Sequence, residues 1–301
     1  MAETQERSCP VCASRQHVPF ASEHINTDKI TEFTYASRKQ PEFMRHRMVR
    51  CCSCDLVYVP APPDSATLTT AYEQAAYDSS EEADCAALTY ARVLQPHLTR
   101  LTKRDVAVDI GAGNGAFLPH LKEVGFKTAL GVEPSRAAAE AATPELQKDI
   151  IVDMFRPELL AGIRPSLITS FMTLEHVDDP FALLRSVHDA LAPGGMIAIV
   201  VHNRLGFLNR ILGLRSPIMD VEHLQLFNPQ SVHTLLERAG FSGISIQSFS
   251  NSYPLSYWLR LTPLPSRLKR CALSACEVLH VARLRLPMYV GNIFCIAQKN
   301  T

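Results

Sequence analysis

The chain has 301 residues, 30 basic and 30 acidic side chains, and 47% hydrophobic residues. These values predict a soluble globular protein of one large domain or two modest ones. Balanced charge gives no general nucleic-acid footprint, so no specific nucleic-acid partner is expected. The N-terminus is polar, and the longest aliphatic run, 196–201, is far too short to cross a bilayer. We therefore expect a cytoplasmic location.

Two pairs of cysteines open the chain. Cys9 and Cys12 are followed, after 38 intervening residues, by Cys51 and Cys54. Paired thiolates at this spacing form the knuckles of a tetrahedral structural zinc site, and two knuckles supply four ligands. The loop between them is longer than usual, and other side chains could substitute as ligands: His17, His24, His46 and Cys52. The sequence predicts a small zinc-binding domain at 1–60; a metal-free small domain is the alternative.

A helical region follows this segment. Three prolines near residue 60 indicate a linker, and helices are expected at 67–76 and 81–94. We predict that 61–104 forms the linker and a helical cap over a cofactor cleft. The remainder, 105–301, alternates strands and helices, which predicts a doubly wound, mostly parallel α/β sheet.

A glycine-rich turn follows the first strand of this region, 106–110. The turn consists of Gly111, Ala112, Gly113, Asn114 and Gly115. Glycines let the backbone turn sharply and approach a ligand closely. A second strand, 128–132, ends at Glu133 and Pro134, where an acid can bind both hydroxyls of a ribose. Turn and acid together predict half of a site for an adenosine compound.

Glycine spacing alone does not identify that compound. The same turn fits the fingerprint of nicotinamide dinucleotide enzymes, in which alanine can replace the last glycine. Asp109, directly before the turn, would repel a pyrophosphate but attract the ammonium group of an amino-acid cofactor. This favours S-adenosylmethionine.

With these motifs the sequence resembles the class I S-adenosylmethionine-dependent methyltransferases, in the group that carries an N-terminal zinc knuckle. The resemblance covers roughly 70–300. Besides the turn it rests on Leu174-Glu175-His176-Val177 with Asp179-Pro180, on Pro193-Gly194-Gly195 before a strand, and on Leu235-Leu236 with Gly240-Phe241. It implies a seven-stranded sheet with an antiparallel final strand at 292–298.

The resemblance also implies further cofactor contacts. Asp153 and Met154 would lie against the adenine, Met172 at the carboxyl end of strand four, and Tyr77, with Tyr72, near the methionine moiety. For a hydroxyl acceptor a general base helps, and histidine has a suitable pKa. His223 is the first candidate, followed by His176 and His202; a carbon or nitrogen acceptor needs no base.

Two insertions, at 202–222 and 250–290, interrupt the sheet region. Within 202–219 and 250–290 nine Lys or Arg residues face the single acid Glu277. If they roof the acceptor site, they predict an anionic small molecule, nucleotide-sugar or lipid-linked glycan as acceptor, or peripheral membrane contact through 250–290. A solvated helix face is the alternative. The predicted function is methyl transfer to a small molecule or glycan, with O-methylation favoured; a nicotinamide-dependent oxidoreductase and a catalytically silent zinc protein are the alternatives.

Overall fold

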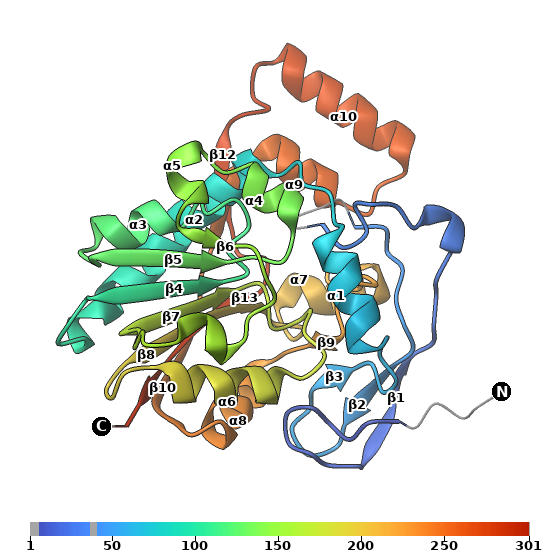
Figure 1. Ribbon diagram of the computed structural model, residues 1–301. Helices are drawn as coiled ribbons and strands as arrows, with labels where there is room; N and C mark the ends of the chain where they lie inside the picture. The colour runs from blue at the N-terminus through green and yellow to red at the C-terminus, as the bar shows by residue number, and fades with distance from the viewer. Residues whose placement is uncertain (1–5, 37–40, 301) are drawn as a thin grey trace.

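A seven-stranded sheet forms the centre of the computed structural model, which describes residues 6–36 and 41–300 (Figure 1). Its spatial order is β10-β13-β8-β7-β4-β5-β6. In chain order the strands are β4 (Val106–Ile110), β5 (Thr128–Val132), β6 (Ile150–Ile151), β7 (Leu167–Phe171), β8 (Met196–His202), β10 (Phe241–Ser248) and β13 (Asn292–Lys299). All run parallel except β13, which pairs antiparallel with both β8 and β10. The predicted fold class and the antiparallel last strand are confirmed.

The two faces of the sheet bury different helices, because successive strand residues point to opposite sides. Val108 of β4 packs with α6 (Pro180–Ala190) and α8 (Pro229–Arg238). Its neighbour Ala107 packs on the other side with α2 (Ser80–Leu94) and α3 (Leu118–Glu123). The short connections are η2 (Gln95–Arg100), α4 (Arg136–Glu140), α5 (Pro144–Gln147) and η3 (Pro157–Leu160). The sheet is thus doubly wound, as predicted.

The N-terminal segment forms a second sheet, of order β1-β2-β3-β9. Its strands are β1 (His17–Ala21), β2 (Met48–Cys51), β3 (Val57–Tyr58) and β9 (Gln225–Leu226), with η1 (Thr27–Lys29) in the long loop. The last of these comes from the second half of the chain, and Val57 pairs with Leu226. The four-stranded sheet therefore includes one strand from outside residues 1–60. The ends of the predicted domains at residues 1 and 301 lie outside the described residues.

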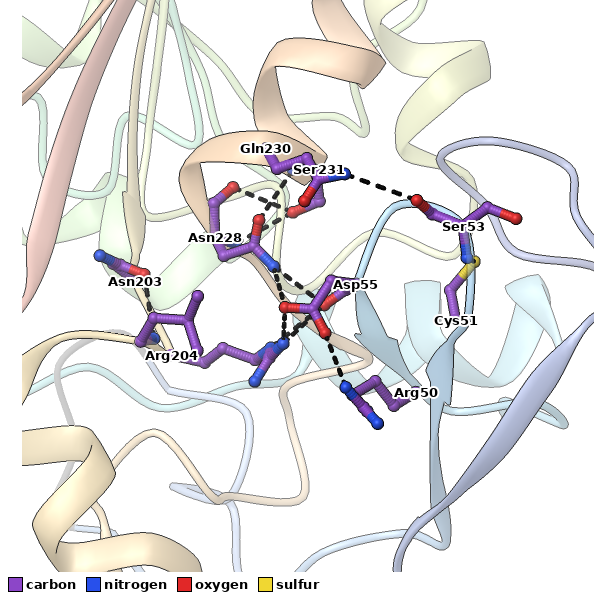
Figure 2. Close-up of polar contacts among 10 residues, drawn as sticks. Arg50, Cys51, Ser53, Asp55, Asn203, Arg204, Asn228, Gln230 and Ser231 are labelled. Carbon is purple, nitrogen blue, oxygen red and sulfur yellow. Dashed lines mark hydrogen bonds and ion pairs between the residues drawn. The ribbon is translucent and has the colours of Figure 1, made fainter.

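Asp55 joins this segment to the region of the large sheet, as Figure 2 shows. Its backbone carbonyl accepts hydrogen bonds from Arg204 Nη2 at 2.9 Å and Asn228 Nδ2 at 2.9 Å, and its carboxylate pairs with Arg204 and Arg50. Asn228 also caps α8 through Ser231. Desolvation lowers the pKa of Arg204, and the charge of the paired Asp55 opposes this shift. The N-terminal sheet is thus fixed to the region of the seven-stranded sheet.

The remaining elements surround the carboxyl edge of the large sheet. They are α1 (Ser65–Glu73), α7 (Phe207–Leu212), η4 (Gly213–Arg215), β11 (Asn251–Pro254), α9 (Leu255–Leu261), α10 (Ser266–Val278) and β12 (Arg285–Met288). Asp64 caps α1, so that helix begins earlier than the sequence predicted. Figure 1 shows α10 on the outside of α9, away from the sheet. No helix among the described residues has the length and apolar character needed to span a membrane.

Candidate active site

A cavity of about 540 Å³ opens at the carboxyl ends of the central strands. Such edges are where open α/β sheets bind ligands. One end of the cavity adjoins Gly111, Glu133 and Met172, and the other contains three histidines and several carboxylates. The cavity is large enough for a nucleoside cofactor and a small acceptor side by side.

The glycine turn is built as the sequence predicted. Gly111, Gly113 and Gly115 all have positive φ, at 78°, 57° and 72°. A side chain on Gly111 would lie 2.4 Å from Thr173 Oγ1, whereas one on Gly113 would meet no protein atom within 4 Å. The first glycine is therefore required by packing, and Gly113 leaves open space above the backbone.

Glu133 locks the turn to the end of β5. Its Oε2 accepts the Gly113 N–H at 2.8 Å, and its Oε1 accepts the Ser135 N–H at 2.8 Å. Each carboxylate oxygen has two lone pairs, so an oxygen that accepts a backbone N–H can accept a second hydrogen bond. The residue predicted to bind a ribose also orients the backbone beneath it.

The predicted cofactor residues divide into two groups. Six line the cavity: Gly111, Glu133, Pro134, Met154, Met172 and Tyr77. The other six lie outside its lining: Asp109, Ala112, Gly113, Asn114, Gly115 and Asp153. Asp109 is buried beneath the turn, where Thr169 Oγ1 donates to it at 2.6 Å, and Asp153 pairs with Arg156 at 2.5 Å. Tyr72 also lines the cavity, and desolvation raises its pKa.

The three candidate histidines lie close together in the cavity. The ring of His223 lies 4.9 Å from that of His176 and 5.3 Å from that of His202. Nδ1 of His223 lies 2.9 Å from the carbonyl of Ile218, which can only accept, so Nδ1 carries the hydrogen. In the neutral ring Nε2 then presents the lone pair, 3.9 Å from Glu222 Oε1. His176, Glu222 and His223 bring ligand atoms within 4.8 Å of one another, a donor set that could also hold a divalent cation.

Glu175 brings the histidines together from three elements. Its carbonyl accepts the Leu224 N–H at 2.8 Å, and its Oε1 accepts the His202 N–H at 2.7 Å. Gln225 Nε2 donates to the carbonyls of Leu174 and Val177 at 2.6 and 2.7 Å. These bonds tie the segment before β9 to the loop after β7, which places His223 beside His176.

The Lys and Arg residues of the two insertions do not line the cavity, which corrects one expectation. None of their nine Lys or Arg residues is among the lining side chains described; the basic residue there is Arg156. The second insertion does roof the site, but through an aromatic group: Tyr253, Tyr257 and Trp258. The sequence analysis did not predict this group, although the three aromatic residues lie within six positions of the chain. It also did not predict that Glu222 lines the cavity.

The N-terminal segment contributes to the same cavity. Tyr35 and Pro41 line it, and the Tyr35 ring lies 5.4 Å from that of Tyr72. Through these two residues the loop between the cysteine pairs reaches the cavity. Its unusual length has a structural explanation that the cysteine spacing alone did not provide.

The four predicted cysteines cluster at the base of this segment. Their sulfur atoms lie within 4.8 Å of one another, with Cys9 and Cys54 at 3.5 Å and Cys12 and Cys51 at 3.4 Å. Tetrahedral zinc with Zn–S bonds of about 2.3 Å separates its sulfurs by roughly 3.8 Å, so the cluster fits such an ion. The hydrogen bond between Cys54 and Cys9 lowers the pKa of Cys9 and raises that of Cys54, which favours the thiolate form that binds metal at Cys9.

Comparison with known families decides the class of this chain. Residues 77–246 match the model of a methyltransferase domain family, described as "Methyltransferase domain". The chain belongs to this family. The matched range contains the glycine turn, Glu133 and the histidine cluster, and the predicted class, an S-adenosylmethionine-dependent methyltransferase, is confirmed.

Solved structures resemble part of this methyltransferase. An S-adenosylmethionine-dependent methyltransferase from Archaeoglobus fulgidus is 19% identical, with 70% of this chain and 93% of that chain covered and a TM-score of 0.47. A possible histamine N-methyltransferase from Thermotoga maritima is 20% identical (71% and 89% covered, TM-score 0.46). A plantazolicin methyltransferase in complex with SAH is 16% identical (79% and 91% covered, TM-score 0.49). At TM-scores below 0.5 these likenesses say nothing about what this methyltransferase binds. Among curated proteins, none matches the sequence.

Proposed function

We propose that this methyltransferase moves a methyl group from S-adenosylmethionine to a hydroxyl of an uncharged, sugar-like ring. The observation that carries the proposal is a single cavity lined by Gly111 of the glycine turn, by Glu133 and by the Glu222–His223 pair. The cofactor would lie over Gly113 with its ribose hydroxyls on Glu133. Tyr77 and Met172 also line this cavity.

The sulfonium of S-adenosylmethionine supplies an activated methyl group, so the protein mainly has to align a nucleophile behind it. Alignment of this kind can contribute on the order of 7–11 kcal/mol. The acceptor oxygen forms the new C–O bond as the S–C bond breaks, and its proton goes to Nε2 of His223. Glu222 stabilises the imidazolium that results, because a carboxylate favours the charged form of a nearby imidazole. The hydrogen bond from Nδ1 to Ile218 fixes the ring for this step.

The lining of the acceptor end favours a neutral polyhydroxylated ring. Asp220 and Glu222 offer oxygens that accept hydroxyl hydrogens, and Tyr257 and Trp258 offer apolar ring faces. An anionic group would meet these carboxylates at an electrostatic cost, and Arg156, the basic residue of the lining, already pairs with Asp153. A nucleotide-sugar or lipid-linked glycan therefore fits with its phosphates outside the cavity. The anionic character expected from the basic insertions has no support at this position.

Ligand specificity and product chemistry test this proposal together. S-adenosylhomocysteine at about 100 times its Kd should stabilise the protein by about 2.7 kcal/mol, and NADH should not. Incubation with methyl-labelled S-adenosylmethionine and a fractionated cell extract should then place label in a base-stable methyl ether. Stabilisation by NADH alone would contradict the cofactor assignment, and label in a base-labile methyl ester would contradict the acceptor assignment.

We also propose that Cys9, Cys12, Cys51 and Cys54 hold one structural zinc ion. Four thiolates close the coordination shell, so the ion would have no position open for substrate. Its contribution would be to fold the segment that carries Tyr35 and Pro41 to the cavity. The segment would not act as a separate domain, because its strand β3 pairs with β9, which begins two residues after His223.

The purified protein should contain about one zinc per chain, and Cys54→Ser should lose it. Cys52→Ser is the matched control, because Cys52 is exposed and lies outside the cluster. Removal of the zinc should increase hydrogen exchange in β2 and β3 and lower turnover of the acceptor, while S-adenosylhomocysteine still stabilises the protein. Elemental analysis checks the metal, and full zinc content in Cys54→Ser would refute this ligand set.

A further inference from the structure

The segment 251–288 forms a projecting unit above the cavity. Strands β11 and β12 pair antiparallel at its base, and α9 and α10 lie between them in the chain. Trp258 Nε1 donates to the Leu286 carbonyl at 3.0 Å, and Arg260 pairs with Glu82 of α2. Lys269 Nζ donates to the Arg260 carbonyl at 2.8 Å, which ties α10 to α9. The unit is thus held in a defined orientation.

The two helices of this unit are buried very differently. In α9, Tyr257 and Trp258 are buried and line the cavity. In α10 no residue is buried. Leu268 is 59% exposed, Val278 75% and Leu279 69%. Because Leu268 and Leu279 are eleven residues, or about three turns, apart, they lie on one side of the helix, and they form a continuous apolar stripe with Cys271 and Ala275, which are also exposed.

Positive charge flanks this stripe. Arg267, Arg270 and Arg283 are exposed. In the described part of the chain no carboxylate forms an ion pair with any of the three. The one acid in the whole segment 250–290 is Glu277. At 3.6 residues per turn, Arg267 and Arg270 lie about 100° and 160° around α10 from Leu268, on the same side of the stripe. A helix with an apolar face and cations on its polar face is the pattern of one that lies in the interface of an anionic bilayer.

We propose that α10 docks this methyltransferase on an anionic lipid surface. Charge decides between a membrane and a second copy of the chain as the occupant of the stripe. In a self-paired dimer each copy would bring three exposed arginines and one carboxylate, so most of the charge would face like charge. An anionic bilayer compensates all three. Since α9 roofs the cavity and α10 packs on its outer side, docking brings the roof of the cavity toward the lipid.

One consequence rests on the proposed function, whereas the docking itself does not. A glycan attached to a lipid would be presented to the cavity from the bilayer, with its phosphates left in the region of positive charge outside. Vesicle binding is measured without any methyl transfer. A failure of docking and a failure of the acceptor assignment are therefore separate results.

Flotation of the full-length protein with vesicles tests the docking. Vesicles of phosphatidylglycerol and phosphatidylcholine should bind at least about tenfold more tightly than phosphatidylcholine alone, and higher salt should weaken the binding. Arg267→Gln with Arg270→Gln should weaken it about thirtyfold, at roughly one kilocalorie per mole for each charge. Leu268→Ser with Leu279→Ser should also release the protein, because the apolar insertion is lost.

Matched charge removal elsewhere gives the control. Lys103→Gln with Lys148→Gln removes two exposed cations away from α10 and should leave vesicle binding unchanged. Equal weakening in the control and in the Arg267/Arg270 variant would overturn the proposal, as would absence of binding to anionic vesicles. A wild-type dimer in sedimentation that Leu268→Ser with Leu279→Ser converts to monomer, without vesicle binding, would assign the stripe to a second copy instead.

Discussion

Replacing Gly113 with valine should reduce the affinity for S-adenosylhomocysteine at least about a hundredfold, or about 2.7 kcal/mol. The space above this residue is free of protein atoms within 4 Å, and Glu133 holds its N–H from below. A branched side chain would fill that space, where the backbone has to approach the cofactor closely. Isothermal calorimetry measures the loss directly.

Backbone strain has to be separated from loss of the site. Gly113 has φ of 57°, so any L side chain there is strained whether or not a ligand binds. Gly243 offers a matched control, with φ of 58° and likewise no atom near an added Cβ, and it lies in β10, outside the glycine turn. Gly243→Val should show the same strain by thermal unfolding but keep wild-type affinity. If Gly113→Val also keeps it, the glycine turn is not the cofactor site.

Replacing His223 with glutamine should lower kcat by about 10²–10⁴, the range of a general base. The labelled acceptor fraction serves as substrate. Affinity for S-adenosylhomocysteine should not change, because His223 lies at the acceptor end of the cavity. The loss should fall mainly on kcat, and the acid limb of the pH–rate profile should disappear with the imidazole.

His233 provides the matched control for this substitution. It lies on α8, half exposed and paired with Glu237, and does not line the cavity, so His233→Gln should behave as wild type. His176→Gln distinguishes the two candidate bases, since the two rings are neighbours. A large kcat loss in the His176 variant with none in the His223 variant would move the base to His176. Full activity in both would indicate an acceptor that needs no imidazole base.

The sequence by itself determined the fold and the glycine turn with Glu133 beside it. Strand, glycine turn and Glu133 follow one another within 28 residues, 106–133, and local geometry places them together wherever the sheet forms. The clustering of the two cysteine pairs could be predicted for the same reason, since each knuckle is a local structure with a fixed spacing. Signals of this kind need no knowledge of distant contacts.

Tertiary structure alone decided the acceptor half. His176 and His223 come from two separate loops and His202 from the end of β8, and the bonds of Glu175 and Gln225 that join them span up to 51 residues. Charge counts suggested a basic lid, but helix orientation turned Arg267 and Arg270 outward and left Tyr257 and Trp258 facing the cavity. A sequence records which side chains an insertion carries. Which of them face the site depends on packing against α2 and β12, because the direction of a helix face is fixed by what that face buries.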